Sequence, residues 1–129
     1  MTDSNIVNKY TEGLEFTPEK TGKALNVAFN ILDKWSFNDT EKRAALGLSD
    51  TMPLDNKVAI AEAADIKLQF RLSIIIGLYA DLKTFSASHE LMMEWLRRPL
   101  PSGQVPMNVL MSYDYPQMLN LRSAAKSLQ

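Results

Sequence analysis

The side chains that most often carry out enzyme chemistry are scarce in this sequence. There is no cysteine, which excludes disulfides, thiolate zinc sites and a cysteine nucleophile. The single histidine, His89, is followed by Glu90 as in a zinc-protease motif, but Met93 stands where that motif needs its second histidine. The five glycines are scattered and form no phosphate-binding loop. We therefore predict that the chain is not an enzyme, uses no cofactor and has neither a catalytic nor a metal site.

The charges of the chain nearly cancel, but they are unevenly distributed. Its 129 residues are the size of one domain, and 14 Lys and Arg stand against 15 Asp and Glu. This balance excludes a strongly basic nucleic-acid-binding chain. Residues 1–96 carry 10 basic and 14 acidic side chains, whereas residues 97–129 carry 4 basic and 1 acidic. The C-terminal third is therefore the part suited to an anionic partner surface.

The apolar residues are too dispersed for a membrane span. The longest apolar stretch, residues 72–79, is interrupted by Ser73 and Gly77 and is far shorter than the roughly 20 residues that a bilayer requires. Residues 1–10 are polar and lack the apolar core of a signal peptide. We therefore expect a cytoplasmic protein that makes no contact with membranes.

Helix start and stop signals predict an all-α fold of six or seven helices. Thr17 can cap a helix that Pro18 opens. Asn38 and Glu41 form a capping-box pattern, and Gly47 suits the left-handed conformation that follows a helix end. Apolar residues recur at helical spacing, without sustained strand-like alternation. The predicted helices span residues 18–35, 39–46 and 58–85 (with a bend near 63–65 that could divide it), then a helix capped by Ser86 or Ser88 and ending at Arg98, then residues 106–111 and a last helix from Pro116 almost to Gln129. Residues 1–16 are expected to form a flexible arm.

Two stretches of the sequence resemble a known family. The first consists of ILDKWS at residues 31–36 and EKRAALGLS at residues 41–49. The second consists of RLSIIIGLYADL at residues 71–82, EWLRRP at residues 94–99 and VPMNVL at residues 105–110. Together they resemble the Xre/MbcA/ParS antitoxins with their C-terminal toxin-binding domain.

The resemblance covers about residues 20–128 and implies one compact multi-helix unit with two regions. A helix-turn-helix-like region, residues 17–64, would pack on a C-terminal toxin-binding region, residues 65–129. Such antitoxins form homodimers and pair with a RES-domain toxin, an enzyme that consumes NAD⁺. The C-terminal segment of the antitoxin covers the active-site cleft of the toxin, so the resemblance implies a non-catalytic, neutralising partner.

The C-terminal third has a composition that fits this role. It is rich in methionine, whose flexible thioether suits partner surfaces, and its cations suit anionic groups of a partner. The residues expected to contact the toxin are Met111, Met118, Arg122, Lys126, Leu128 and Gln129.

Two other functions stand as alternatives. The family's N-terminal half can bind the promoter of its own operon, so the chain could be a DNA-binding regulator that uses Lys42, Arg43, Thr51, Asn56 and Lys57. The segment after the predicted turn carries Asp50 and Asp55, whose repulsion from phosphates opposes this interpretation. The chain could also be an orphan helical interaction module that has the fold but no toxin.

Some conspicuous residues favour a structural interpretation. Trp35 and Trp95 lie on the apolar faces of predicted helices, and we expect both in the core. Arg71 opens the pattern shared with the family, and we expect it to pair with a nearby acid, Glu94 or Asp81.

Overall fold

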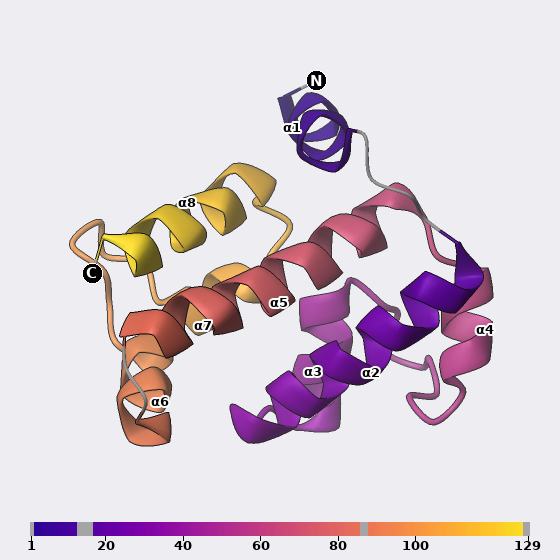
Figure 1. Ribbon diagram of the computed structural model, residues 1–129, viewed down its shortest axis with the longest axis horizontal. Helices are drawn as coiled ribbons and strands as arrows, with labels where there is room; N and C mark the ends of the chain where they lie inside the picture. Colours follow the sequence, from indigo (N-terminus) through magenta and orange to yellow (C-terminus); the bar gives the residue numbers. More distant parts are fainter. Residues whose placement is uncertain (1, 13–16, 86–87, 128–129) are drawn as a thin grey trace.

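The computed structural model describes residues 2–12, 17–85 and 88–127, and these form eight helices and no strand (Figure 1). The all-α prediction is confirmed. The helices are α1 (Thr2–Thr11), α2 (Pro18–Lys34), α3 (Asp39–Leu46), α4 (Lys57–Glu62), α5 (Ile66–Phe85), α6 (His89–Arg97), α7 (Pro106–Leu110) and α8 (Tyr115–Lys126). Within the described ranges, no helix has the length and apolar character needed to cross a membrane.

α5 is the central helix of the fold. Its apolar residues are distributed around the whole circumference, the pattern of a helix enclosed by others. Four helices, α1, α2, α3 and α8, pack against it, and α2 also packs on α4. Figure 1 shows α5 running through the middle of the molecule, with α2, α3 and α4 toward its first half and α6, α7 and α8 toward its second. The core therefore forms around the middle of this helix, residues 68–79, which is buried or partly buried on every side, whereas Lys67 and Lys83 near its ends are exposed.

The N-terminal helices begin and end where their capping residues predict. The Thr17 side chain accepts a hydrogen bond from the backbone N–H of Lys20 at the start of α2. The Asn38 side chain and the Glu41 side chain satisfy each other's backbone N–H groups at the start of α3. α3 ends at Gly47, whose φ of 69° is the left-handed conformation that favours glycine. The predicted bend is present as well, since residues 63–65 separate α4 from α5.

α1 takes the place of much of the expected flexible arm. Val7 is 1% exposed and Thr11 is 3% exposed, and the Thr11 hydroxyl donates a hydrogen bond to the Val7 carbonyl. The helix packs on α5 and α8 (Figure 1), so its partners lie far along the chain. Ten residues with weak periodicity do not predict a stable helix by themselves, because most helical stability comes from tertiary packing. Residues 13–16 of the expected arm lie outside the described residues.

A hydrogen bond joins the end of α6 to the end of α2. Arg97 donates from Nη2 to the carbonyl oxygen of Trp35 at 2.7 Å. Trp35 is fully buried, as predicted, and its ring lies beside the rings of Phe37 and Tyr79. Trp95, by contrast, is only partly buried. One of the two tryptophans therefore contributes to a surface as well as to the core.

Candidate protein-binding surface

α8 uses two of the residues that were expected to contact a toxin inside its own fold. Met118 is 1% exposed and shares a buried helix face with Leu121 and Ala125. The expectation of a surface contact at Met118 is therefore corrected to a core position. Arg122 is also engaged within the chain. Met118 lies in the core because the apolar face of α8 is buried against α5, and this burial is more favourable than leaving the face exposed for a partner.

Arg122 joins three helices, and we call Arg122, Asp81 and Tyr10 the Arg122 clasp. Nε and Nη2 of Arg122 donate to the two carboxylate oxygens of Asp81 at 2.8 and 3.2 Å, and Nη1 donates to the Tyr10 hydroxyl at 3.0 Å. The hydrogen bonds to Asp81 raise the pKa of Arg122 above its ordinary value, although burial acts in the opposite direction. The Arg122 and Asp81 side chains are 24% and 11% exposed, so the pair is largely desolvated. The clasp fixes α8 and α1 to α5.

Gly77 makes room for this clasp. A Cβ built at Gly77 would lie 2.5 Å from Cζ of Arg122, closer than any real side chain could stand. Asp81 lies one helical turn further along α5, on the same face. The guanidinium therefore lies across the bare backbone of Gly77 to reach Asp81. Arg122 has a structural role that the sequence pattern did not reveal.

The other C-terminal candidates remain near the surface. Met111 is partly buried at the end of α7, and Lys126 is exposed in the last turn of α8. Leu128 and Gln129 lie outside the described residues. Met111 and Lys126 are therefore the expected contact residues that the described structure leaves accessible.

An apolar depression lies between α6 and the last turns of α8, and we call it the α6–α8 groove. It has a volume of about 420 Å³ and is formed by α6, the proline-rich turn that follows it, and the last turns of α8. Leu91 is 47% exposed at this groove, and the partly buried Trp95 contributes its accessible side. The lining residues are Leu91, Glu94, Trp95, Arg98, Pro99, Leu100, Pro101, Ala124 and Ser127. Sequence reasoning placed Trp95 in the core and did not find this groove.

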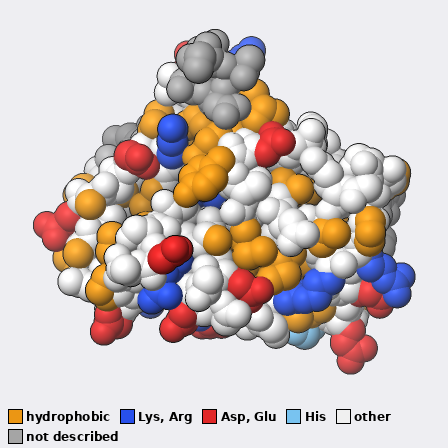
Figure 2. Space-filling view, turned by 180° about the vertical axis from the view of Figure 1, so that it is seen from behind, with side chains coloured by type: hydrophobic (Ala, Val, Ile, Leu, Met, Phe, Trp, Pro, Cys, Tyr) orange, Lys and Arg blue, Asp and Glu red, His pale blue; other side chains and the backbone are white. Residues whose placement is uncertain are grey.

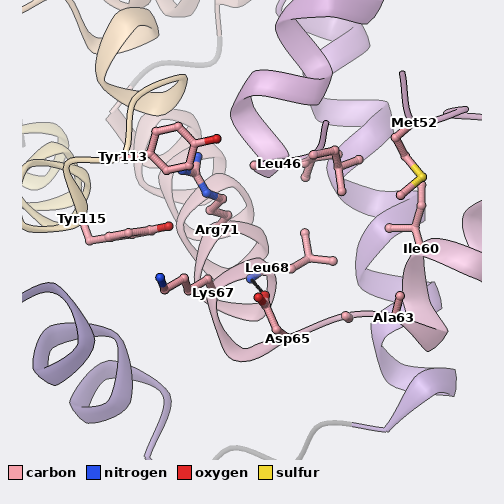
Figure 3. Close-up of a pocket in the computed structure, with 13 residues that line it drawn as sticks. Leu46, Met52, Ile60, Ala63, Asp65, Lys67, Leu68, Arg71, Tyr113 and Tyr115 are labelled. Atoms are coloured by element: carbon pink, nitrogen blue, oxygen red, sulfur yellow. Dashed lines mark hydrogen bonds between the residues drawn. The ribbon is translucent and has the colours of Figure 1, made fainter. Parts of the chain in front are cut away.

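Arg71 is a buried cation at a second depression, a pocket of about 350 Å³ (Figure 3). It is 2% exposed and donates four hydrogen bonds to backbone carbonyls at 2.7–3.3 Å. These carbonyls belong to Ala44, Ala45, Leu110 and Ser112. The guanidinium also lies 5.0 and 5.3 Å from the ring centroids of Tyr113 and Tyr115. Figure 3 shows both rings beside Arg71, with Leu46 and Ile60 toward the other side of the pocket.

The expected ion pair of Arg71 with Glu94 or Asp81 is wrong. Asp81 pairs with Arg122 and Glu94 pairs with Arg98, and no carboxylate in the described ranges forms a salt bridge with Arg71. Its charge is instead met by the C-terminal ends of α3 and α7, each of which carries up to about half a negative charge from the helix dipole. Arg71 thus joins two helix ends to α5, which is a structural role.

The residues expected to contact DNA are mostly held by other parts of the chain. Lys42 forms ion pairs with Asp33 and Asp39, and its side chain is only 14% exposed. Arg43 donates from Nε to the carbonyl of Met52 at 2.7 Å. The Lys57 ammonium lies over the ring of Phe29, 5.0 Å from its centroid. The Asn56 side chain caps α4 by accepting a hydrogen bond from the backbone N–H of Ala59. Thr51 is exposed, and its hydroxyl lies beside that of Ser49.

The segment after Gly47 does not form the recognition helix that DNA binding would require. Residues 47–56 connect α3 to α4 without a helix, whereas a helix-turn-helix unit has a turn of about three or four residues. α4 has six residues and packs against α2. On the face shown in Figure 2, acidic and basic side chains are interspersed and do not gather into one basic stripe. The geometry therefore does not favour the helix-turn-helix interpretation of residues 17–64.

Comparison with models of protein families, with curated proteins and with solved structures found no match for this chain.

Proposed function

We propose that this chain is an antitoxin-like protein that binds and neutralises a RES-type, NAD-degrading toxin and catalyses no reaction itself. The proposal is supported by the resemblance carried by residues 71–82, 94–99 and 105–110, together with an accessible apolar surface in the same region. The α6–α8 groove is the observation that carries it. Four residues of the shared stretch 94–99 line this groove, namely Glu94, Trp95, Arg98 and Pro99. Leu96, in the same stretch, is buried in the core.

The composition of the groove suits a protein partner. An exposed apolar side chain such as Leu91 gains free energy when a partner covers it, and contiguous apolar surface commonly marks an interaction site. Arg98 and Glu94 both line the groove and pair with each other. Lys126 is exposed in the turn of α8 that also carries the lining residue Ser127. An apolar groove with the Arg98–Glu94 pair at its edge is suited to an apolar side chain that projects from the toxin and has charged groups around it.

The way α8 packs modifies how the neutralising segment would act. Because Met118 and Arg122 are engaged within the fold, the folded protein would offer the last turn of α8 and the groove rather than the whole helix. A deletion from Asn120 onward would remove Leu121 and Ala125 from the core, so it would test stability and not binding. Surface substitutions are the appropriate test.

The test is a titration of the chain against the NAD⁺ hydrolysis of a RES-type enzyme encoded beside its gene. Leu91→Glu is expected to raise the concentration needed for inhibition about tenfold or more, because a charge would be placed in the centre of the contact. Val58→Glu on α4, where Val58 is 69% exposed, is the matched control and is expected to inhibit like the unmodified chain. No inhibition by the unmodified chain, or equal inhibition by both variants, contradicts the proposal.

The DNA-binding alternative is tested separately. A gel-shift with the chain's own upstream DNA at low salt is expected to give no complex, because Lys42 and Arg43 are held by Asp33 and by the Met52 carbonyl. A complex whose affinity falls steeply with salt would support the regulator instead. If no NAD-degrading enzyme accompanies the gene, the orphan interaction module becomes the better interpretation.

A further inference from the structure

We infer that α1 is a releasable clamp that holds α8 in place through Arg122, and that undocking of α1 frees α8 for partner binding. The first part concerns the chain alone. The second part, the consequence for a partner, rests on the proposed function.

The described side chains of α1, residues 6–11, include four that attach it to the molecule. Among its described side chains, Val7 and Thr11 are buried and Ile6 and Tyr10 are partly buried, whereas Asn8 and Lys9 face outward. A ten-residue helix has little stability in water without a docking surface. Docking and folding of α1 are therefore coupled, and the helix is expected to be among the first elements to open.

Tyr10 connects α1 to α8 by two routes. Its hydroxyl accepts the hydrogen bond from Nη1 of Arg122 at 3.0 Å. Its ring meets Phe70 edge-on at 5.1 Å, and Phe70 in turn meets the ring of Tyr115 at 5.4 Å, at the start of α8. One α1 side chain thus supports α8 both near its beginning and near its middle.

Loss of α1 removes both supports at once. Arg122 would keep its bonds to Asp81, but it would lose the Tyr10 acceptor and gain solvent, which weakens a charged pair through screening. Phe70, now 0% exposed, would lose one of its covering rings. α8 then keeps its packing on α5 but loses the contact with α1, so it opens from α5 more easily, and its opening exposes Met118 and Leu121 as apolar contacts for a partner.

The absence of cysteine from the sequence allows a direct test. A Met118→Cys variant places one thiol at a position that is 1% exposed, so its alkylation rate reports the opening of α8. In this background, Val7→Asn should undock α1 and raise the rate about tenfold or more, because a buried amide without partners opposes docking. Lys9→Asn introduces the same residue on the outer face of α1 and is the matched control, with an unchanged rate.

Tyr10→Phe separates the clamp from general loss of stability. It keeps the ring on Phe70 and removes only the acceptor of Arg122, so the alkylation rate is expected to rise about three- to tenfold. Amide exchange in α1 verifies that Val7→Asn has undocked the helix. An undocked α1 with an unchanged alkylation rate of the introduced thiol overturns the inference. If Val7→Asn unfolds the whole chain, the result with Tyr10→Phe decides.

The thiol measurement needs no partner, so it succeeds or fails independently of the proposed function. In the titration against the toxin, Val7→Asn without the introduced thiol should inhibit at lower concentration than the unmodified chain. If the thiol rate rises but the inhibitory concentration does not fall, the clamp exists and its regulatory consequence is refuted. If no chain variant inhibits the toxin, the proposed function fails while the clamp stands.

Discussion

Replacement of Arg71 by alanine tests the main structural argument about the core. The guanidinium is 2% exposed and gives hydrogen bonds to four backbone carbonyls from two separate segments, residues 44–45 and residues 110–112. The alanine variant would leave these carbonyls without their donor and would leave a cavity in place of the side chain. The perturbation is therefore local, buried and chemically defined.

The magnitude follows from these contacts. A buried acceptor that loses its donor costs about 1–3 kcal/mol, and the loss of two cation–π contacts adds to this. Water can enter from the adjoining pocket of about 350 Å³ and hydrate part of the exposed carbonyls, which lowers the total. We expect Arg71→Ala to reduce the free energy of unfolding by about 3–5 kcal/mol, the combined cost of several carbonyls that are only partly rehydrated and of the cavity left by the side chain. Arg71→Lys keeps the charge but not the planar set of donors and should cost about 1–3 kcal/mol.

Urea denaturation followed by circular dichroism and tryptophan fluorescence measures these differences. Arg98→Ala is the control, because Arg98 has a side chain that is 72% exposed and its ion pair with Glu94 should contribute less than about 1 kcal/mol. A denaturation midpoint of Arg71→Ala equal to that of Arg98→Ala, at an unchanged slope, would refute the argument that helix ends substitute for a carboxylate at Arg71.

Three further predictions concern glycines, a cap and the clasp. Gly77→Ala is expected to lower the free energy of unfolding by about 1–3 kcal/mol, because the added Cβ would collide with Arg122. A Cβ at Gly22 would have no atom within 4 Å, so Gly22→Ala should stabilise α2 by about 0.5–1 kcal/mol. Urea denaturation of the two variants compares these effects. Asn38→Ala removes the capping box of α3 and should lower stability by about 1 kcal/mol, measured by thermal melting. Because the pKa of Arg122 is raised in the fold, its stabilising contribution is complete below its ordinary pKa and is lost only at strongly alkaline pH. The alkylation rate of the Met118→Cys variant, corrected for thiolate fraction, should therefore stay constant between about pH 7 and about pH 9, and a marked rise would contradict the assignment.

Local signals in the sequence predict most helix boundaries but little of what the helices do. The capping groups at Thr17 and Asn38 and the left-handed Gly47 depend on neighbours within four residues, so the sequence alone is sufficient to place them. α1 has no comparable signal, because its stability comes from α5 and α8. α1 can therefore be predicted only when the positions of α5 and α8, on which it packs, are known.

The roles of the arginines illustrate the same limit for the candidate site. Charge and position in the sequence suggested that Arg122 contacts a partner and that Arg71 pairs with an acid. The actual contacts of both arginines depend on tertiary geometry. The first lies across Gly77 to reach Asp81, and the second binds carbonyls at helix ends, which no charge pattern reveals. A glycine in an otherwise apolar helix, as at position 77, was the one available sign of a close approach.

The bond between Tyr10 and Arg122 links residues 112 positions apart, and it has a consequence for biosynthesis. As the chain leaves the ribosome, α1 emerges first and yet has no completed surface to dock on until α8 follows. During this interval the middle of α5, residues 68–79, is only partly covered, and a chaperone or a second nascent chain could occupy the uncovered side. Docking of α1 therefore waits until α8 has been synthesised, and these two helices, far apart in the sequence, complete the structure together.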